Sequence, residues 1–133
     1  MAAFQLEIVS PEQLIFSSEV ESVIVPGTEG EFTVLRDHAP LISSLKPGII
    51  TASETASKIT RFFVPGGFAE VAASGLTILA NEAVDTENMD SGRFDGVMAK
   101  FEEQITESVS EEERRVAVER RDQLRELQAS LAL

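Results

Sequence analysis

His38 is the only histidine in the chain, and an imidazole can serve as a general base near neutral pH. It lies between Asp37 and Ala39-Pro40, inside a segment, 26–48, that contains three glycines and three prolines. This composition predicts a loop interrupted by one strand. A single loop histidine, with no nucleophile at a suitable spacing, is typical of a structural residue that forms a hydrogen bond. We therefore predict no catalytic residues and a protein that is not an enzyme.

Two further segments resemble ligand-binding motifs without meeting their requirements. Residues 85–92, DTENMDSG, place oxygen atoms at alternating positions, as a calcium loop does. The sixth position is not glycine, however, and the twelfth is Gly96 rather than an acid. We predict a capped linker here and no metal site. Gly66-Gly67 does not belong to a GxGxxG nucleotide fingerprint, and we predict a tight turn between two strands.

The composition indicates a small globular protein. The chain has 133 residues, enough for one domain or a small domain with an appendage, and its 43% apolar content can form a core. A formal net charge of −12 argues against nucleic-acid binding, which needs clustered basic residues, and favours basic proteins as partners. The absence of cysteine excludes disulfides. Since no apolar run of about eighteen residues and no targeting peptide is recognisable, we expect no direct membrane insertion.

The chain from Phe4 to about Asn81 has the alternating polarity of β-strands. The breaks between its apolar runs contain proline, glycine and serine, which are typical of turns. About eight short strands at roughly ten-residue spacing predict an antiparallel sandwich or flattened barrel. The expected strands cover residues 4–8, 20–25, 31–35, 48–51, 58–64, 67–72 and 76–80.

After about Asp85 the apolar spacing changes to that of α-helices. Asp90 or Ser91 is the expected cap of a first helix. Ser110 followed by Glu113 forms a capping box for a second helix over 111–131. The first helix is expected to bury the stripe Phe94, Val97, Met98, Phe101 and Ile105. The second helix has a thinner stripe, Ala117, Leu124, Leu127 and Leu131, so we expect that it can detach at modest cost.

Three arginines of the second helix, Arg114, Arg121 and Arg125, follow each other at i, i+7 and i+11 and therefore point in one direction. They make a basic stripe on an acidic chain. Such a stripe is either a solvated helix face or a contact surface for an acidic partner.

Several motifs, taken in order, resemble the epsilon subunit of bacterial F-type ATP synthases over nearly the whole chain. Any one of them alone would be weak, but their order and spacing are specific. The residues alone also permit a free-standing β-sandwich interaction module with a helical arm, and only the ordered motifs separate the two readings. The motifs are SPE at 10–12, VPGxxGEF at 25–32, HAPL at 38–41, LKPG at 45–48 and GGFAEV at 66–71.

The resemblance implies a β + α architecture: an N-terminal antiparallel β-sandwich of about ten strands over 1–86, followed by an antiparallel two-helix hairpin over 87–133. It implies a non-catalytic rotor subunit in the central stalk, which links the gamma subunit to the c-ring so that ion flow is coupled to ATP synthesis. The residues implied to contact the rotor and the c-ring are Gly27, Glu29, Gly30, Glu31, His38, Ala39, Pro40 and Leu41.

The resemblance also implies roles for the helices. In the family, the hairpin can extend and inhibit ATP hydrolysis, and Arg114, Arg121 and Arg125 are the candidates to contact the catalytic beta subunit, with the alpha subunit nearby. As part of the synthase, the protein is expected at the cytoplasmic face of the bacterial plasma membrane.

Some members of the family bind ATP on the folded hairpin through the motif I/L-D-x-x-R-A. The corresponding residues 89–94, MDSGRF, keep Asp90 and Arg93 but have Met89 and Phe94 at the flanking positions. This departure argues against ATP binding. We expect no cofactor, with a regulatory ATP at Asp90 and Arg93 as the alternative.

Overall fold

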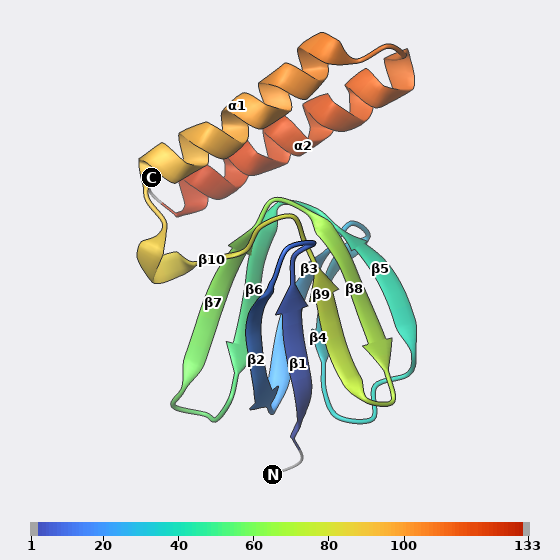
Figure 1. Cartoon of the computed structure of the whole chain (residues 1–133), viewed down its shortest axis with the longest axis vertical. Coiled ribbons are helices and arrows are strands. Elements are labelled where there is room, and N and C mark those ends of the chain that lie inside the picture. Colours follow the sequence, from blue (N-terminus) through green and yellow to red (C-terminus); the bar gives the residue numbers. More distant parts are fainter. Residues whose placement is uncertain (1–2, 132–133) are drawn as a thin grey trace. The chain divides into compact units, whose positions relative to one another are not determined.

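The computed structural model describes residues 3–131, and the chain divides into two compact units, Met1–Glu87 and Asn88–Leu133 (Figure 1). The first unit is built of strands, and the second is a pair of helices. The strands are β1 (Phe4–Val9), β2 (Leu14–Val20), β3 (Ser22–Gly27), β4 (Gly30–Val34), β5 (Leu41–Leu45), β6 (Gly48–Ser53), β7 (Ile59–Val64), β8 (Gly67–Ala72), β9 (Gly75–Leu79) and β10 (Val84–Asp85).

The ten strands form one hydrogen-bonded sheet in the order β10-β7-β6-β3-β5-β8-β9-β1-β2, with β4 paired to β3. Neighbours pair antiparallel except β1 and β9, which are parallel. The two ends of this order meet, because the rings of Phe16 on β2 and Phe62 on β7 are 5.0 Å apart. Ser18 on β2 also donates to Glu54, which precedes β7, at 3.0 Å. The sheet thus curves around a shared core, and the predicted fold class is confirmed.

The core of the first unit is made of apolar side chains from β1 to β9. Alternation sends every second side chain inward on β1, where Leu6 and Ile8 are fully buried, whereas β7 buries three consecutive residues, Phe62–Val64. Burial of such side chains stabilises the sheet by roughly 25 cal/mol per Å² of apolar surface. The buried set is Leu6, Ile8, Val20, Val23, Val25, Val34, Leu45, Ile50, Ala52, Phe62, Val64, Ala69, Val71, Leu76, Ile78 and Ala80.

Seven of the strands lie where the polarity pattern predicts them, and three do not: β2, β5 and β10. The prediction that 26–48 is a loop with one strand is wrong, because the segment holds both β4 and β5. On β5, only Leu45 is buried, while Leu41 and Ile42 are exposed. Because the outward-facing Ile42 is apolar, β5 lacks the polar–apolar alternation that identifies a strand in the sequence. Hydrogen bonding to β8 keeps the segment extended.

Gly66 and Gly67 form the predicted turn between β7 and β8. Both have positive φ angles, 154° and 127°, which L side chains rarely adopt. A Cβ atom at Gly67 would lie 2.1 Å from the carbonyl oxygen of Leu79. The turn therefore needs glycine for two reasons, conformation and space.

The second unit consists of helices α1 (Ser91–Glu107) and α2 (Glu111–Ser130), preceded by a 3-10 turn, η1 (Thr86–Asn88). Asp90 caps α1, where its Oδ1 accepts from the backbone N–H of Arg93 at 2.9 Å. Ser110 caps α2, where its Oγ accepts from the N–H of Glu113 at 3.1 Å. The reciprocal bond of this box goes to Val109, whose N–H donates to Glu113 at 3.2 Å. Both predicted caps are confirmed.

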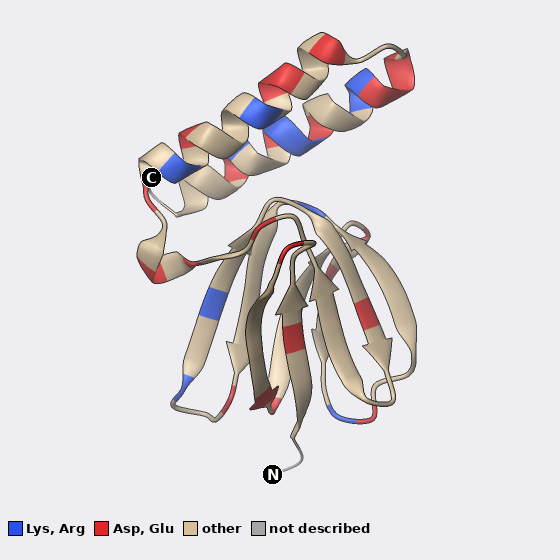
Figure 2. Ribbon diagram, viewed as in Figure 1, with Lys and Arg blue, Asp and Glu red and all other residues tan. Residues whose placement is uncertain are grey.

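The two helices bury few side chains. Phe94, Val97 and Phe101 on α1 are buried as predicted, but on α2 only Ala117 and Leu124 are. Figure 2 shows acidic and basic residues interspersed along both helices, whereas most residues of the strands are uncharged. Neither of the described helices is long and apolar enough to cross a membrane.

Candidate partner-binding surfaces

The β3–β4 turn presents two carboxylates, Glu29 just before β4 and Glu31 within it. Glu29 and Glu31 are exposed, while Pro26 and Gly27 beneath them are buried. Hydrogen bonds attach the loop to the end of β5: Thr28 N–H donates to the carbonyl of Ser44 at 3.0 Å, and the two hydroxyls lie 2.8 Å apart. The backbone that carries the carboxylates is therefore held in place before a partner arrives, which limits the backbone entropy lost on binding.

The segment from His38 to Leu41 turns the chain between β4 and β5. Asp37 has a φ of 66°, a conformation that aspartate tolerates better than most residues. The His38 ring bonds through Nδ1 to the carbonyl oxygen of Ala39 at 2.7 Å, so Nδ1 carries the proton. The backbone N–H of His38 donates to the carbonyl oxygen of Leu35 at 3.2 Å. These bonds make His38 a loop-stabilising residue, in agreement with its predicted structural role.

A hollow of about 570 Å³ lies beside this segment. Its wall includes Phe4 and Val71, with the charged residues Arg36 and Asp37 and the imidazole of His38 along the same lining. The hollow is concave and mixed in polarity, so it can receive a side chain of another protein.

The structure does not bring the two predicted rotor segments together. Glu29 precedes β4 and His38 follows it, so a whole strand separates them. Five residues in a strand span about 13 Å. Leu41 lies at the same end of the sheet as His38, because β5 runs back toward Leu45, which pairs with Gly27. The predicted residues therefore form two surfaces at opposite ends of β4.

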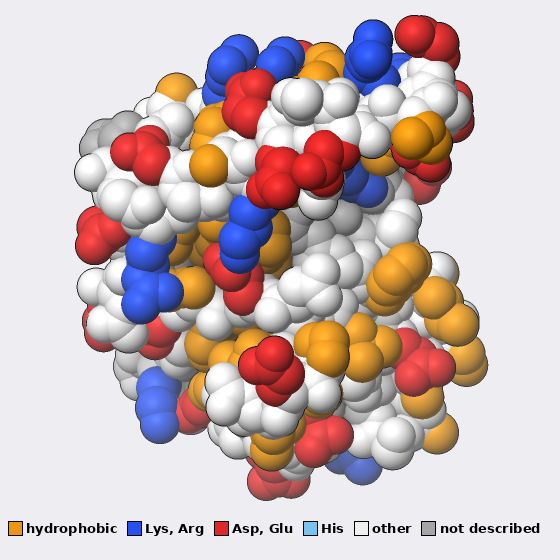
Figure 3. Space-filling view, turned by 45° about the horizontal axis from the view of Figure 1, so that its top comes forward, with side chains coloured by type: hydrophobic (Ala, Val, Ile, Leu, Met, Phe, Trp, Pro, Cys, Tyr) orange, Lys and Arg blue, Asp and Glu red, His pale blue; other side chains and the backbone are white. Residues whose placement is uncertain are grey.

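The structure shows a third surface, made of exposed apolar side chains, that the sequence pattern did not predict. Ile42 on β5, Phe68 on β8 and Leu79 on β9 are 71%, 54% and 46% exposed. Ser44 pairs with Phe68, and Phe68 pairs with Leu79, so these side chains share one face of the sheet. Ile42 is two residues before Ser44 and therefore lies on the same face, opposite Glu70 of β8. We call Ile42, Phe68 and Leu79 the apolar face. Figure 3 shows hydrophobic side chains gathered on the side of the sheet where Figure 1 draws β5 and β8.

The basic stripe of α2 is already occupied in part. Arg121 and Arg125 both face Glu102 of α1, each with a nitrogen 3.6 Å from one of its oxygens. Arg114 lies 3.9 Å from Glu111 of its own helix. The predicted stripe therefore divides into two arginines that pair with the other helix and one that pairs locally.

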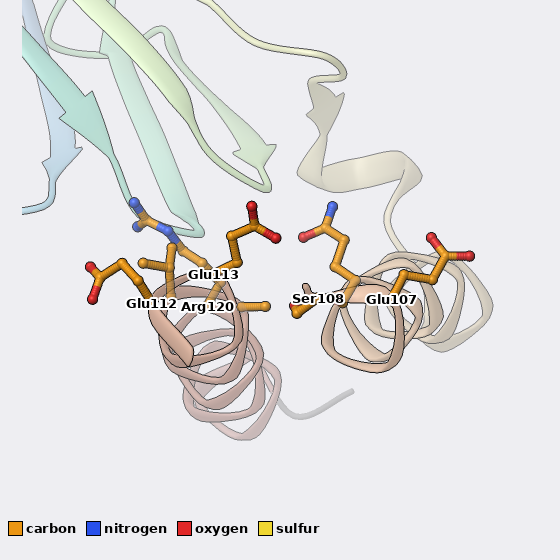
Figure 4. A pocket seen from close by; sticks show the side chains of 8 residues that line it. Glu107, Ser108, Glu112, Glu113 and Arg120 are labelled. Carbon is orange, nitrogen blue, oxygen red and sulfur yellow. Dashed lines mark hydrogen bonds between the residues drawn. The ribbon is translucent and has the colours of Figure 1, made fainter. Parts of the chain in front are cut away.

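A hollow of about 470 Å³ lies between α1 and α2 at the end of the hairpin where the loop joins the two helices. Figure 4 shows Glu107 and Ser108 on one side of it, with Glu112, Glu113 and Arg120 on the other. The Arg115 guanidinium donates to Glu112 at 2.6 Å and holds the pKa of that carboxyl below its ordinary value. Glu112 thus serves a pair on the helix surface, and Glu113 serves the cap of α2.

Asp90 and Arg93, the two residues kept from the ATP motif, lie at the start of α1. Asp90 uses its carboxylate as the helix cap, and both residues are exposed. In the linker before them, Asp85 accepts from the N–H of Glu87 at 3.0 Å. Within residues 3–131, no group of three or more histidine or acidic side chains is arranged to hold a metal ion.

Known proteins resemble the chain over its whole length. The family model described as "ATP synthase, Delta/Epsilon chain, beta-sandwich domain" matches residues 3–86. The ATP synthase epsilon chain of Nitrobacter winogradskyi is 41% identical, over 98% of this chain and 96% of its own length. The epsilon chain of Parvibaculum lavamentivorans is 39% identical, over 91% of this chain and 92% of its own.

Two solved structures have the same fold. The first is a chain of the Euglena gracilis mitochondrial ATP synthase, in a structure of OSCP, F1 and c-ring. The match covers 98% of this chain and 82% of the Euglena chain, with a TM-score of 0.73 and 25% sequence identity. A chain in the central stalk and c-ring of the Tetrahymena thermophila mitochondrial ATP synthase superposes over 98% of this chain and 96% of its own, with a TM-score of 0.67. At 12% identity, the second likeness concerns the fold alone.

Proposed function

Because the chain belongs to the ATP synthase delta/epsilon family, whose relatives at about 40% identity are epsilon chains, we propose that it links the gamma subunit to the c-ring in the central stalk. Epsilon chains are non-catalytic subunits of this membrane-associated complex. Ion transport and ATP synthesis are functions of the whole assembly. The subunit makes and breaks no covalent bond; it transmits torque through its contacts.

The apolar face is the observation that carries this proposal. Side chains as large as Ile42 and Phe68 are costly to leave in water, and their grouping on adjacent strands marks a protein-binding surface. The surface belongs to the unit with the large core, so it is rigid. A rigid apolar surface suits a permanent contact that must carry torque, and we assign it to gamma.

The two rotor segments then have separate partners. The exposed carboxylates of Glu29 and Glu31, on a turn that is hydrogen-bonded to β5, suit basic side chains of the c-ring, because attraction between opposite charges steers and orients such a contact. The hollow beside His38 lies at the other end of β4, and Ala39, Pro40 and Leu41 continue from it to the start of β5. We place the second rotor contact there.

The hairpin is the regulatory element of the proposal. Its basic residues Arg114, Arg121 and Arg125 are the groups that would meet an acidic segment of the beta subunit near alpha, and this contact would slow ATP hydrolysis. The cytoplasmic face of a bacterial plasma membrane is the location that the bacterial relatives favour. Regulatory ATP at Asp90 and Arg93 remains a subordinate proposal, supported only by the two retained motif residues.

Co-elution with the gamma subunit of the same genome tests the proposal. The double variant Ile42→Ser/Phe68→Ser should lose co-elution on size exclusion, since it removes two large side chains from the apolar face. Leu14→Ser/Ile59→Ser is the matched control, because these two side chains are also exposed but lie on β2 and β7.

Wild type and control should both elute with gamma. If folded wild type does not, or if both double variants behave alike, the assignment of the apolar face is wrong. Failure of wild type would favour a free-standing interaction module. Circular dichroism of each variant checks that the fold is intact.

A further inference from the structure

Glu102 on α1 contacts the two arginines that the proposed function assigns to an acidic partner. Its Oε2 lies 3.6 Å from Arg121, and its Oε1 lies 3.6 Å from Arg125. The arginines are four residues apart on α2, so one carboxylate from the facing helix reaches both. The spacing of the arginines in the sequence indicates that they share one face of α2. Only the packing of the helices shows that Glu102 of α1 contacts the arginines on that face.

The exposure and the other contacts of Arg121, Arg125 and Glu102 indicate how strong the ion pairs between them are. Arg121 is 21% exposed and also bonds to Asp122, its neighbour on α2, at 3.3 Å. Arg125 is 57% exposed, and Glu102 is 45% exposed. At 3.6 Å the contacts to Glu102 are ion pairs longer than a good hydrogen bond. A partner carboxylate that forms bidentate bonds with either guanidinium would bind it more strongly.

We propose that Glu102 is an internal competitor, which occupies Arg121 and Arg125 while α1 and α2 are packed together and must withdraw before an acidic protein segment binds them. The inference rests on the proposed function for the identity of that partner. It adds the regulation of the site: the same two arginines hold the hairpin together and bind the partner, and they cannot do both at full strength. Separation of the helices removes the competitor.

The exposure of Glu102 allows this exchange. A carboxylate that is nearly half exposed can rotate into water without leaving a buried charge unpaired, so its displacement has a small penalty. Arg114 provides an internal contrast, because its partner Glu111 belongs to the same helix and stays beside it when the helices separate. Only Arg121 and Arg125 change partners in this scheme.

Binding of a fluorescein-labelled oligoglutamate peptide to the full chain, followed by anisotropy at low ionic strength, tests the competition. Glu102→Gln should tighten binding by about two- to fivefold relative to Glu103→Gln, since exposed ion pairs contribute up to about 1 kcal/mol. Glu103 is the neighbouring exposed acid on α1, so both variants change the net charge of the chain equally. The difference should vanish when Arg121→Gln and Arg125→Gln are added.

Equal affinities of Glu102→Gln and Glu103→Gln, including no binding by either, would overturn the inference. A difference that persists without the two arginines would overturn it as well. The helical circular dichroism of each variant confirms that α1 and α2 have formed. Because the peptide titration uses no synthase subunit, its failure is separate from a failure of gamma to co-elute.

Discussion

The sheet unit and the hairpin differ in what holds them together. Sixteen buried apolar residues from nine strands and the loop after β9 interlock in the first unit, and residues far apart in sequence contact each other throughout it. The hairpin buries three large side chains on α1 and, on α2, one leucine and one alanine. The contacts between its helices also include the ion pairs of Glu102 with Arg121 and Arg125. The proposed permanent rotor contact and the proposed regulated contact suit these different constructions, because a large core transmits force while a thin interface can open.

The largest expected effect is on stability, because a cavity in either core should destabilise only the unit to which that core belongs. Ile78→Ala should destabilise the sheet unit by about 2 to 5 kcal/mol, because it leaves a cavity among fully buried side chains. Leu124→Ala should instead weaken the helical signal and leave the unfolding of the sheet unchanged. Urea unfolding followed by fluorescence of a reporter in the sheet and by helical circular dichroism measures both. A single transition that both variants shift equally would contradict the division.

Replacing a glycine by alanine should have opposite effects on stability in the two units, which sharpens the comparison. Gly67→Ala should destabilise the sheet by about 1 to 3 kcal/mol or more, because the φ of 127° is strained for alanine and the Cβ would meet the carbonyl of Leu79. Gly96→Ala should stabilise α1 by about 0.5 to 1 kcal/mol, because nothing lies within 4 Å of the added Cβ. Thermal unfolding of both variants tests the signs, and destabilisation by Gly96→Ala would show an unrecognised close contact.

The caps test how far the hairpin depends on local bonds. Ser110→Ala should cost about 1 kcal/mol of α2 stability, because the N–H of Glu113 loses its acceptor. Ser130→Ala is a control at the other end of the same helix, where the hydroxyl only donates to the carbonyl of Leu127. Hydrogen exchange of the first turn of α2 should increase in Ser110→Ala. Unchanged exchange there would mean that packing, rather than the cap, begins the helix.

The smallest effect depends on pH and concerns the sheet unit. Lys58 and Ser18 bond to Glu54 at 2.8 and 3.0 Å and lower the pKa of its carboxyl. A lowered pKa in the folded state means that the ionised carboxylate stabilises the fold above its ordinary pKa, and that this contribution disappears as the pH falls through the folded value. Glu54→Gln should therefore be less stable than wild type at neutral pH and equal to it in acid. Urea unfolding at both pH values measures the difference, and a constant gap would contradict the assignment.

The candidate site was less predictable than the fold. Seven strands, two helices and both helix caps follow from local patterns, since alternation, a 3.6-residue period and a capping serine act over a few neighbouring residues. β5 was missed because Ile42 faces outward where a polar residue is expected. The residues 27–31 and 38–41 belong to one segment and are separated by only six residues in sequence, yet β4, which begins at Gly30, carries the chain from one site to the other end of the strand.

By itself the sequence determined the change from a strand period to a helix period near Asp85, the caps Asp90 and Ser110, and, through its ordered motifs, the family. Only the tertiary structure decided that Ile42, Phe68 and Leu79 lie together on one outer face, and that Glu102 occupies Arg121 and Arg125. The reason is physical. Periods and caps depend on neighbours along the chain, whereas strand register and helix packing set the distances between residues that the sequence holds far apart.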